Sequence, residues 1–499
     1  TAIPMRMFEN CDGLSVVNFT GAIDSLGDYS FNNCDTLRTV NFSKDATLTN
    51  VGVSVFVRSK SLTRFNVASG NSALTTAYSG SIILNSDSTE FILIAPAFNM
   101  SKYSWATSNV KSIGKATFSG RTDIVNLDLS LSKIERIEAM AFVENIIINA
   151  ITLPTSLEYI GELAFAGCYN LTSVTIPDGV TVGKGAFFDC AYIYKDINDK
   201  YVLGKALLEV NVGKDVKLGE AAFYYSQGLR TVNLPDDKSV TLDVATFGFC
   251  VSLQQIDLTQ FVEIPEAAFV ECYSLVSPDL SQTQKIGNDA FAFAYMWSHC
   301  NYTYLNLASV TELGEGAFFG NASLFEVELN DELKVIPAFA FAANFNLSMI
   351  NLENVEEIGE GAFYYNISEP IQIIPVGGEQ MLDIPEFYPG SGLKTLNLTN
   401  CKTIGDGAFA YAAWVTTINA PVVEEIGSEA FAGYVTIDLP ASIANNYIYV
   451  PRYATSLKTV NFGSEARDIK IGDMAFHVNV NLETFDFANV TEIGAGAFY

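Results

Sequence analysis

A six-residue pattern recurs from one end of the chain to the other and constrains the fold more than any other feature. Its first residue is aliphatic, its second is often Gly, the third and fourth vary, the fifth is small and the sixth is Phe. In total, 19 copies end in Phe. Clear copies are IGELAF at 160–165, IGEGAF at 358–363 and IGDMAF at 471–476, and a looser copy is LIAPAF at 93–98. Most neighbouring copies lie 22 to 24 residues apart. A fixed period of this length is typical of a solenoid, in which one small unit is stacked many times.

A second pattern, L-x-x-V-x-I/L/F, follows each Phe after a short polar connection, as in LTSVTI at 171–176 and LRTVNL at 229–234. Its last residues alternate between apolar and polar, which predicts a short strand with one buried face. A unit with one strand and one Phe-centred turn cannot bury its own apolar face, so stacked units must share a continuous core. We therefore expect one elongated domain over residues 1–499, with about 20 rungs.

These units resemble the BspA-like leucine-rich-repeat family. The resemblance is carried by I-G-x-x-A-F, by the F-x-x-C/N that follows it and by L-x-x-V-x-I-P, all present in FAGCYNLTSVTIP at 165–177. It implies a leucine-rich-repeat solenoid of the α/β type, a curved right-handed superhelix with a parallel β-sheet on its concave face. It also implies a secreted or cell-surface protein of bacteria or protists that serves in adhesion and protein contacts.

Two stretches break the period. The first contains two apolar runs around a polar turn within 81–94, which predicts a β-hairpin insert at about 68–92. The second predicts another hairpin insert at about 191–212, with Gly204 and Lys205 at its turn. Such inserts are either tolerated surface decoration or places where binding concentrates.

The composition argues against several classes of function. Lys and Arg total 28 against 56 Asp and Glu, so the net charge is −28 and the pI is about 4.3. That charge disfavours nucleic acid and anionic membrane surfaces as partners. The chain has two His and none of the common metal or nucleophile motifs, and no apolar run reaches 18 residues. We expect no enzyme activity, cofactor, metal site or membrane insertion.

The cysteines recur at one position of the repeat. Six of the eight lie three residues after the Phe: Cys11, Cys34, Cys168, Cys190, Cys250 and Cys272. Elsewhere this position holds Asn, Ser or another small residue, which favours a buried ladder of small polar side chains. The alternative is disulfides between consecutive rungs, because stacked positions can approach the Cα separation of ~4.4–6.8 Å that a bridge needs. We expect reduced thiols.

The second-last residue of each predicted strand faces away from the core and is often Asn or Asp, although Asn is a poor strand former. The candidate binding residues at this position are Asn233, Asp257, Asp279, Asn306, Glu328, Asn351, Asn397, Asn419 and Asp438. Two explanations remain open. The side chains either bond to one another along the stack, or they form a polar, acidic groove for a protein, glycan or cation-bridged ligand.

Ten N-x-[ST] sequons could carry glycans if the protein were secreted by a eukaryote. Their Asn residues are Asn18, Asn41, Asn99, Asn170, Asn301, Asn321, Asn346, Asn366, Asn397 and Asn489.

These observations predict a non-catalytic secreted or cell-surface protein that binds a protein or glycan and serves in adhesion. A different class of function is a structural subunit of an extracellular filament, with copies stacked end to end. Neither end of the sequence contains a capping unit, and solenoids need caps. We therefore expect either a longer protein or ends that other chains cover.

Overall fold

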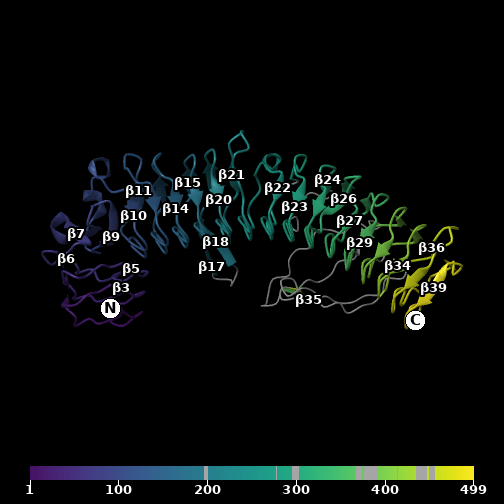
Figure 1. The fold of residues 1–499 in the computed structure, drawn as a ribbon, viewed down its shortest axis with the longest axis horizontal. Helices are drawn as coiled ribbons and strands as arrows, with labels where there is room; N and C mark the ends of the chain where they lie inside the picture. Colours follow the sequence, from purple (N-terminus) through teal and green to yellow (C-terminus); the bar gives the residue numbers. More distant parts are fainter. Residues whose placement is uncertain are drawn as a thin grey trace. The chain divides into compact units, whose positions relative to one another are not determined.

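The computed structural model describes residues 1–195, 201–276, 278–294, 303–366, 374–375, 392–412, 414–433, 447–448 and 456–499. It consists of two compact units, Thr1–Ile256 and Asp257–Tyr499, each of which we describe by itself. Both are stacks of similar turns, and the chain is a parallel β-solenoid of about 18 turns (Figure 1). The solenoid predicted from the repeat is confirmed, whereas a single domain over 1–499 stays a prediction.

The L-x-x-V-x-I segments form parallel sheets that run along each unit. In unit 1 these long strands are β2 (Val16–Phe19), β4 (Thr39–Phe42), β6 (Arg64–Val67), β11 (Asn126–Asp128), β13 (Ala150–Thr152), β15 (Ser173–Ile176), β19 (Glu209–Val212) and β21 (Thr231–Asn233). In unit 2 they are β24 (Thr303–Leu307), β26 (Leu324–Leu329), β28 (Met349–Ile350), β31 (Thr395–Asn397), β33 (Thr417–Asn419), β36 (Thr459–Asn461) and β38 (Thr484–Phe485). Equivalent residues face each other across the pairs, as Val174 faces Val210, so equivalent side chains are buried in most turns.

Most described turns also contain a second strand of two to four residues at the start of the six-residue pattern, and this strand was not predicted. In unit 1 these short strands are β1 (Ala2–Ile3), β3 (Ser25–Leu26), β5 (Asn50–Val51), β10 (Ser112–Ile113), β12 (Arg136–Ile137), β14 (Tyr159–Ile160), β16 (Thr181–Val182) and β20 (Lys217–Leu218). In unit 2 they are β22 (Glu263–Ile264), β23 (Lys285–Ile286), β25 (Glu312–Leu313), β27 (Val335–Ile336), β29 (Glu357–Ile358), β32 (Thr403–Ile404), β34 (Glu425–Ile426), β37 (Ile469–Ile471) and β39 (Val490–Ile493). Most are too short for a sequence to show the alternation of a strand.

The helical elements of the described residues are four 3₁₀ turns, so the α/β label is replaced by an all-β solenoid. They are η1 (Tyr78–Gly80), η2 (Met100–Lys102), η3 (Trp105–Thr107) and η4 (Leu258–Gln260). One further pair of strands, β30 (Ile374–Pro375) and β35 (Tyr447–Ile448), is antiparallel.

The six-residue pattern is explained by close stacking. The Gly in its second position leaves no room for a side chain, because a Cβ on Gly161 would lie 2.5 Å from the amide nitrogen of Ala139 in the neighbouring turn. The fourth position has a left-handed backbone, with φ at 53° for Leu163, which explains why Gly often occupies it. The Phe rings form a buried stack. Phe142 and Phe165 lie 5.0 Å apart with their planes 3° from parallel.

The first insert contains three antiparallel strands, β7 (Leu74–Ala77), β8 (Ile82–Asn85) and β9 (Glu90–Ile94). β9 also pairs in parallel with β10 and places Phe91 opposite Ile113. The prediction that 93–98 is a copy of the repeat is therefore wrong, because β9 already occupies the place of the short strand with which a copy begins. Phe98 instead packs on Tyr78, with ring centroids 5.2 Å apart.

The second insert is the antiparallel pair β17 (Ala191–Lys195) and β18 (Tyr201–Ala206). Gly204 and Lys205 lie inside β18, so their predicted place at the turn is wrong. The connection lies between Lys195 and Tyr201 because the apolar run of β18 begins earlier than the pattern suggested. The insert also ends sooner than expected, since β19 belongs to the long-strand sheet.

Candidate functional site

The Asn residues predicted to line a groove are bonded to one another in several turns. The Nδ2 of Asn41 donates to the Oδ1 of Asn18 at 2.6 Å, and Asn66 donates to Asn41 at 2.7 Å. In unit 2 Asn419 donates to Asn397 at 3.0 Å. These contacts continue the strand pairing through the side chains, which gives the recurring Asn a structural role.

Asn211 is a member of this ladder that the sequence analysis missed. It accepts a hydrogen bond from Asn233 at 2.8 Å. The residue was assigned to the second insert, and recognising β19 as a regular strand would have revealed it.

Other candidate residues form hydrogen bonds with nearby residues, several of them within the turn that follows. The Oδ1 atoms of Asp257, Asp279 and Asn306 each accept from an amide two residues later, at 2.9 to 3.0 Å. Glu328 accepts from the hydroxyl of Tyr304, and Asn351 bonds to both backbone groups of Leu329. Asp438 lies outside the described residues. The structure gives these side chains local partners, and binding by them stays a prediction.

Three sequon residues, Asn321, Asn346 and Asn366, are buried in the folded protein. The Nδ2 of Asn346, where a glycan would be attached, donates to the carbonyl of Ala322 at 2.8 Å. The other described sequons stay candidates for modification, and Asn301 lies outside the described residues.

The position three residues after the Phe has a recurring role. In many turns a Cys, Asn or Ser at this position donates to the carbonyl oxygen of the Phe in the preceding turn. The Sγ of Cys168 donates to Phe142 at 3.4 Å, and the Nδ2 of Asn145 donates to Phe118 at 2.6 Å. Ser226 donates to Phe187 at 2.8 Å in the same way. Cys34, Cys168 and Cys190 are unbridged thiols in the structure.

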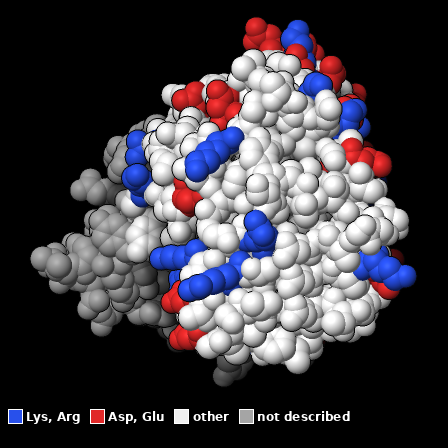
Figure 2. Space-filling view, turned by 90° about the vertical axis from the view of Figure 1, so that its left-hand side faces the viewer, with Lys and Arg blue, Asp and Glu red and all other residues white. Residues whose placement is uncertain are grey.

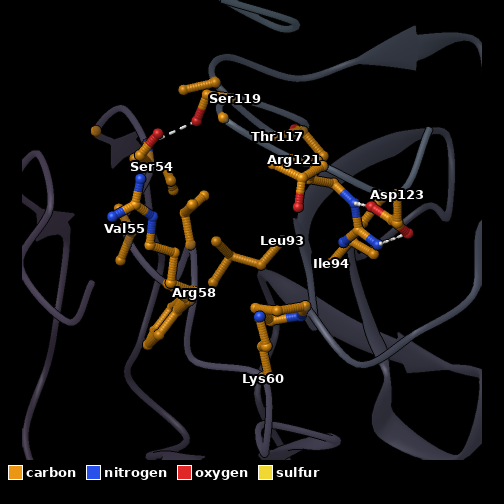
Figure 3. A pocket seen from close by; sticks show the side chains of 18 residues that line it. Ser54, Val55, Arg58, Lys60, Leu93, Ile94, Thr117, Ser119, Arg121 and Asp123 are labelled. Atoms are coloured by element: carbon orange, nitrogen blue, oxygen red, sulfur yellow. Dashed lines mark hydrogen bonds and ion pairs between the residues drawn. The ribbon is translucent and has the colours of Figure 1, made fainter. Parts of the chain in front are cut away.

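A cavity of about 250 Å³ opens beside the first insert and was not predicted (Figure 3). One wall is the Phe turn at 54–58, the other is the Phe turn at 117–121, and Leu93 and Ile94 of β9 line it between them. The two turns touch where the amide of Ser54 donates to the Oγ of Ser119 at 2.6 Å. The cavity exists because the insert takes the chain away before it can complete a regular turn at this place.

Arg121 fixes the far wall of this cavity. Its guanidinium is buried and forms two hydrogen bonds to the Asp123 carboxylate, at 2.7 and 2.9 Å. It also donates to the carbonyl oxygens of Ala95 and Phe98, at 3.2 and 2.8 Å. Four of its five N–H groups are thereby used, so Arg121 anchors the insert.

Two exposed cations lie on the other side of the cavity. Neither Arg58 nor Lys60 has a side-chain hydrogen bond or ion pair with any described residue. Residues 51–123 hold seven Lys and Arg against three Asp and Glu, in a chain whose net charge is −28. On one end face, several Lys and Arg side chains lie in the middle of a largely uncharged surface (Figure 2). The turns on either side of the first insert are therefore locally basic, whereas the insert strands themselves contain no Lys or Arg.

A second hollow, of about 470 Å³, lies at the base of the second insert. Its lining is aromatic: Tyr169, Phe188, Tyr192 and Tyr225, together with Asp189, Ala191, Ile193 and Gln227. Phe188, Tyr192, Ile193 and Tyr225 are between 36% and 51% exposed. Partial burial raises the pKa of Asp189, the one charged group among the described residues that line the hollow. The sequence showed the insert but not the stacking of these residues from separate turns.

Comparison with known families agrees with the repeat. The sequence profile described as "BspA type Leucine rich repeat region (6 copies)" matches residues 1–87, 96–202, 195–296, 292–376 and 383–499. The chain belongs to the BspA-type leucine-rich-repeat proteins. No curated protein matches it.

Solved structures of bacterial leucine-rich-repeat proteins are similar to this BspA-type chain. One from Bacteroides ovatus is 18% identical and has a TM-score of 0.42, with 84% of this chain and 98% of that chain covered. A cell-surface protein from Faecalibacterium prausnitzii is 19% identical, with a TM-score of 0.29 and coverage of 69% and 91%. The pneumococcal vaccine antigen PcpA is 18% identical, with a TM-score of 0.35. The matched region spans 52% of this chain and 63% of PcpA.

The described part of the chain contains no cluster of three or more His, Cys, Asp or Glu that could hold a metal ion. A search of the same residues finds no helix long and apolar enough to span a membrane.

Proposed function

We propose that this BspA-type protein is a non-catalytic, secreted or cell-surface adhesion protein that binds a partner protein. The observation that carries the proposal is the aromatic hollow at the second insert. Soluble proteins rarely leave several large aromatic side chains together at the surface unless the patch binds something. Tyr is favoured in protein interfaces because its ring is rigid and apolar while its hydroxyl stays hydrated.

The hollow can act as such an interface because the solenoid holds it in place. Phe188 and Tyr225 come from neighbouring Phe turns, and their backbones are joined through the hydrogen bond from Asp189 to the carbonyl of Tyr224, at 3.0 Å. Tyr192 projects from β17 and lies near Tyr169, with ring centroids 6.0 Å apart. Little ordering entropy is lost on binding when the contact residues are already fixed.

The test measures binding of the whole chain to a panel of purified extracellular host proteins and, in parallel, to a glycan array. We expect at least one protein to bind, and the double variant Tyr192→Ser/Ile193→Ser to weaken that binding at least tenfold, since anchor residues carry ~2 kcal/mol or more. Val335→Ser is the matched control, because Val335 is 44% exposed on β27 in the other unit.

Equal binding by the double variant would refute the role of the hollow, and binding to glycans alone would replace the protein partner with a carbohydrate. Protease treatment of intact producing cells tests the proposed location, since a surface protein is cleaved while the cells stay closed. The end-to-end filament stays a separate prediction, which electron microscopy of native material tests.

A further inference from the structure

The backbone ladder between turns is interrupted at the cavity of the first insert. In the turn before it, the amide of Phe31 donates to the carbonyl of Val55 at 3.0 Å. In the turn after it, the amide of Phe118 donates to the carbonyl of Ala141 at 2.9 Å. Between these two turns, no described residue provides the equivalent bonds.

Unused donors and acceptors therefore line opposite walls. The amides of Phe56 and Arg58 have no acceptor among the described residues, and no described amide donates to the carbonyl oxygens of Thr117 and Ser119. All four residues line the cavity. On each wall the two groups are two residues apart, the spacing at which the amides of Phe31 and Asn33 both donate to the next turn. Backbone N–H and C=O groups are strong hydrogen-bonding groups, so a ligand with backbone-like groups fits here.

The charge at the cavity selects an anionic group on that ligand. Many lysines in this chain pair with a carboxylate of a neighbouring turn, as Lys111 pairs with Glu135 at 2.6 Å. Among the residues that the structure describes, Arg58 and Lys60 lack such a pair, and the one carboxylate lining the cavity, Asp123, is bound by Arg121. A carboxylate bound beside either cation would form the charge-assisted hydrogen bonds that it lacks.

The remaining lining is largely apolar, with Val55, Val57, Leu93, Ile94 and Pro96. A cavity of about 250 Å³ is slightly below the usual range of small-ligand pockets, ~300–1,000 Å³, so it suits one or two residues rather than a long segment. The hydroxyl of Ser54, buried and without a partner among the described residues, also lines it.

We propose that this cavity binds the carboxyl-terminal end of an extended peptide whose last residue is aliphatic. The terminal carboxylate lies beside Arg58 or Lys60, the peptide backbone pairs with the open groups of the two walls, and the aliphatic side chain packs against Val55 and Leu93. This site is separate from the aromatic hollow, and its test does not depend on the function proposed for that hollow.

The test uses the full chain and an array of peptides attached through their amino ends, with all residue types at the last three positions. A second array carries the same peptides with carboxyl-terminal amides. We expect binding to peptides that end in Val, Ile or Leu, and at least tenfold weaker binding to the amides, because amidation removes the charge. Affinities of the best pair are then measured in solution by calorimetry.

A double variant and a control variant test whether the binding depends on the cavity. Arg58→Asn/Lys60→Gln should weaken binding of the free-acid peptide at least tenfold and leave binding of the amide unchanged. Asn suits position 58 because its φ is +64°. Arg64→Gln is the control, since Arg64 is an exposed cation on β6 that does not line the cavity, and it should change the affinity less than twofold. Melting curves check that all variants are folded.

Three results would overturn the proposal: equal affinity for acid and amide, no bound peptide on either array, or unchanged binding by the double variant. Competition with glucuronate and with N-acetylneuraminate distinguishes a peptide site from a site for acidic glycans. If either sugar bound more tightly than the best peptide and lost affinity in the double variant, the site would be one for acidic glycans and the peptide proposal would be wrong.

Discussion

The residue three positions after each Phe shows how one backbone requirement selects several side chains. Cys190 donates to the carbonyl of Phe165 at 3.3 Å, as Asn and Ser do in other turns. Cys190 is buried, and burial raises the pKa of its thiol to about 12. Such a thiol is a weak nucleophile in the folded protein.

We predict that a thiol-reactive probe labels all eight cysteines of the denatured, unreduced chain and labels Cys190 slowly in the native protein. Mass spectrometry counts the labels. Labelling of only two, Cys300 and Cys401, would mean that the six ladder cysteines form disulfides. It would also show that the protein had passed through an oxidising compartment. Cys300 lies outside the described residues.

Asp289 is a carboxylate whose ionisation works against folding. Burial, and then the charges of Glu266 and Glu315, raise its pKa from 3.8 to about 6. The folded chain therefore binds this proton more tightly than the unfolded chain. The contribution of Asp289 to stability is fully present below its unfolded pKa of 3.8 and is lost as the pH rises through about 6.

Asp289→Asn should therefore raise the melting temperature at pH 7.5 and have a much smaller effect at pH 5. Asp215→Asn is a matched control, because Asp215 is exposed and its backbone is also left-handed, with φ values of 54° and 52° for the two residues. An equal effect of Asp289→Asn at both pH values would show that the change acts through packing rather than through the charge.

At the scale of the repeat, the sequence predicted what recurs and missed what occurs once. The Phe stack and the long strands were predictable because each is written many times in the chain. The short strands were missed because two residues cannot display a period. The cavity was missed because its walls are 65 residues apart at Ser54 and Ser119, and its open groups belong to the backbone.

The second position of the pattern should tolerate no side chain. Gly161→Ala places a Cβ 2.5 Å from the Ala139 amide nitrogen, so the neighbouring turn has to move. We expect a loss of ~1–3 kcal/mol in the free energy of unfolding, as for other overpacked sites. Gly21→Ala is the control, since no atom lies within 4 Å of the added Cβ. Equal stability of both variants in urea unfolding would contradict this explanation.

The Phe stack should be the main apolar contribution of each turn. Phe318 is fully buried between Phe291 and Phe341, with ring centroids 5.4 and 5.7 Å away. Phe318→Ala should cost ~3–5 kcal/mol, because the cavity it leaves cannot close around a rigid stack. Hydrogen exchange should show faster opening in the turns next to it. A loss below 1 kcal/mol would mean that the stack relaxes freely.

For the whole molecule, the repeat makes a candidate site hard to recognise from sequence. The polar residues that attracted attention, such as Asn233 and Asp279, recur because they bond along the stack or close a turn. Both hollows lie instead where inserts interrupt the period, and their lining residues belong to turns that are distant in the sequence.

The net charge of −28 should make stability depend on salt. The exposed pairs between turns, such as Lys184 with Glu220, each contribute ~0–1 kcal/mol and are weakened by salt. Repulsion within so acidic a chain acts over a longer range and is the larger effect. We expect the melting temperature to rise between 10 and 150 mM NaCl, where the Debye length falls from ~30 to ~8 Å. Choline chloride should raise the melting temperature as much as NaCl does. A fall in melting temperature with salt would mean that the ion pairs between turns are the larger effect.

The interchange of Cys, Asn and Ser beside the Phe carbonyl also makes the chain a practical scaffold for spectroscopy. Each ladder cysteine can be recoded as Asn or Ser by copying what a sister turn already uses at Asn145 or Ser226. A cysteine-free version would then accept one engineered thiol on any chosen turn for a fluorophore or spin label. Pairs of such labels would read distances along the stack turn by turn, and would measure directly how the two compact units are placed relative to each other.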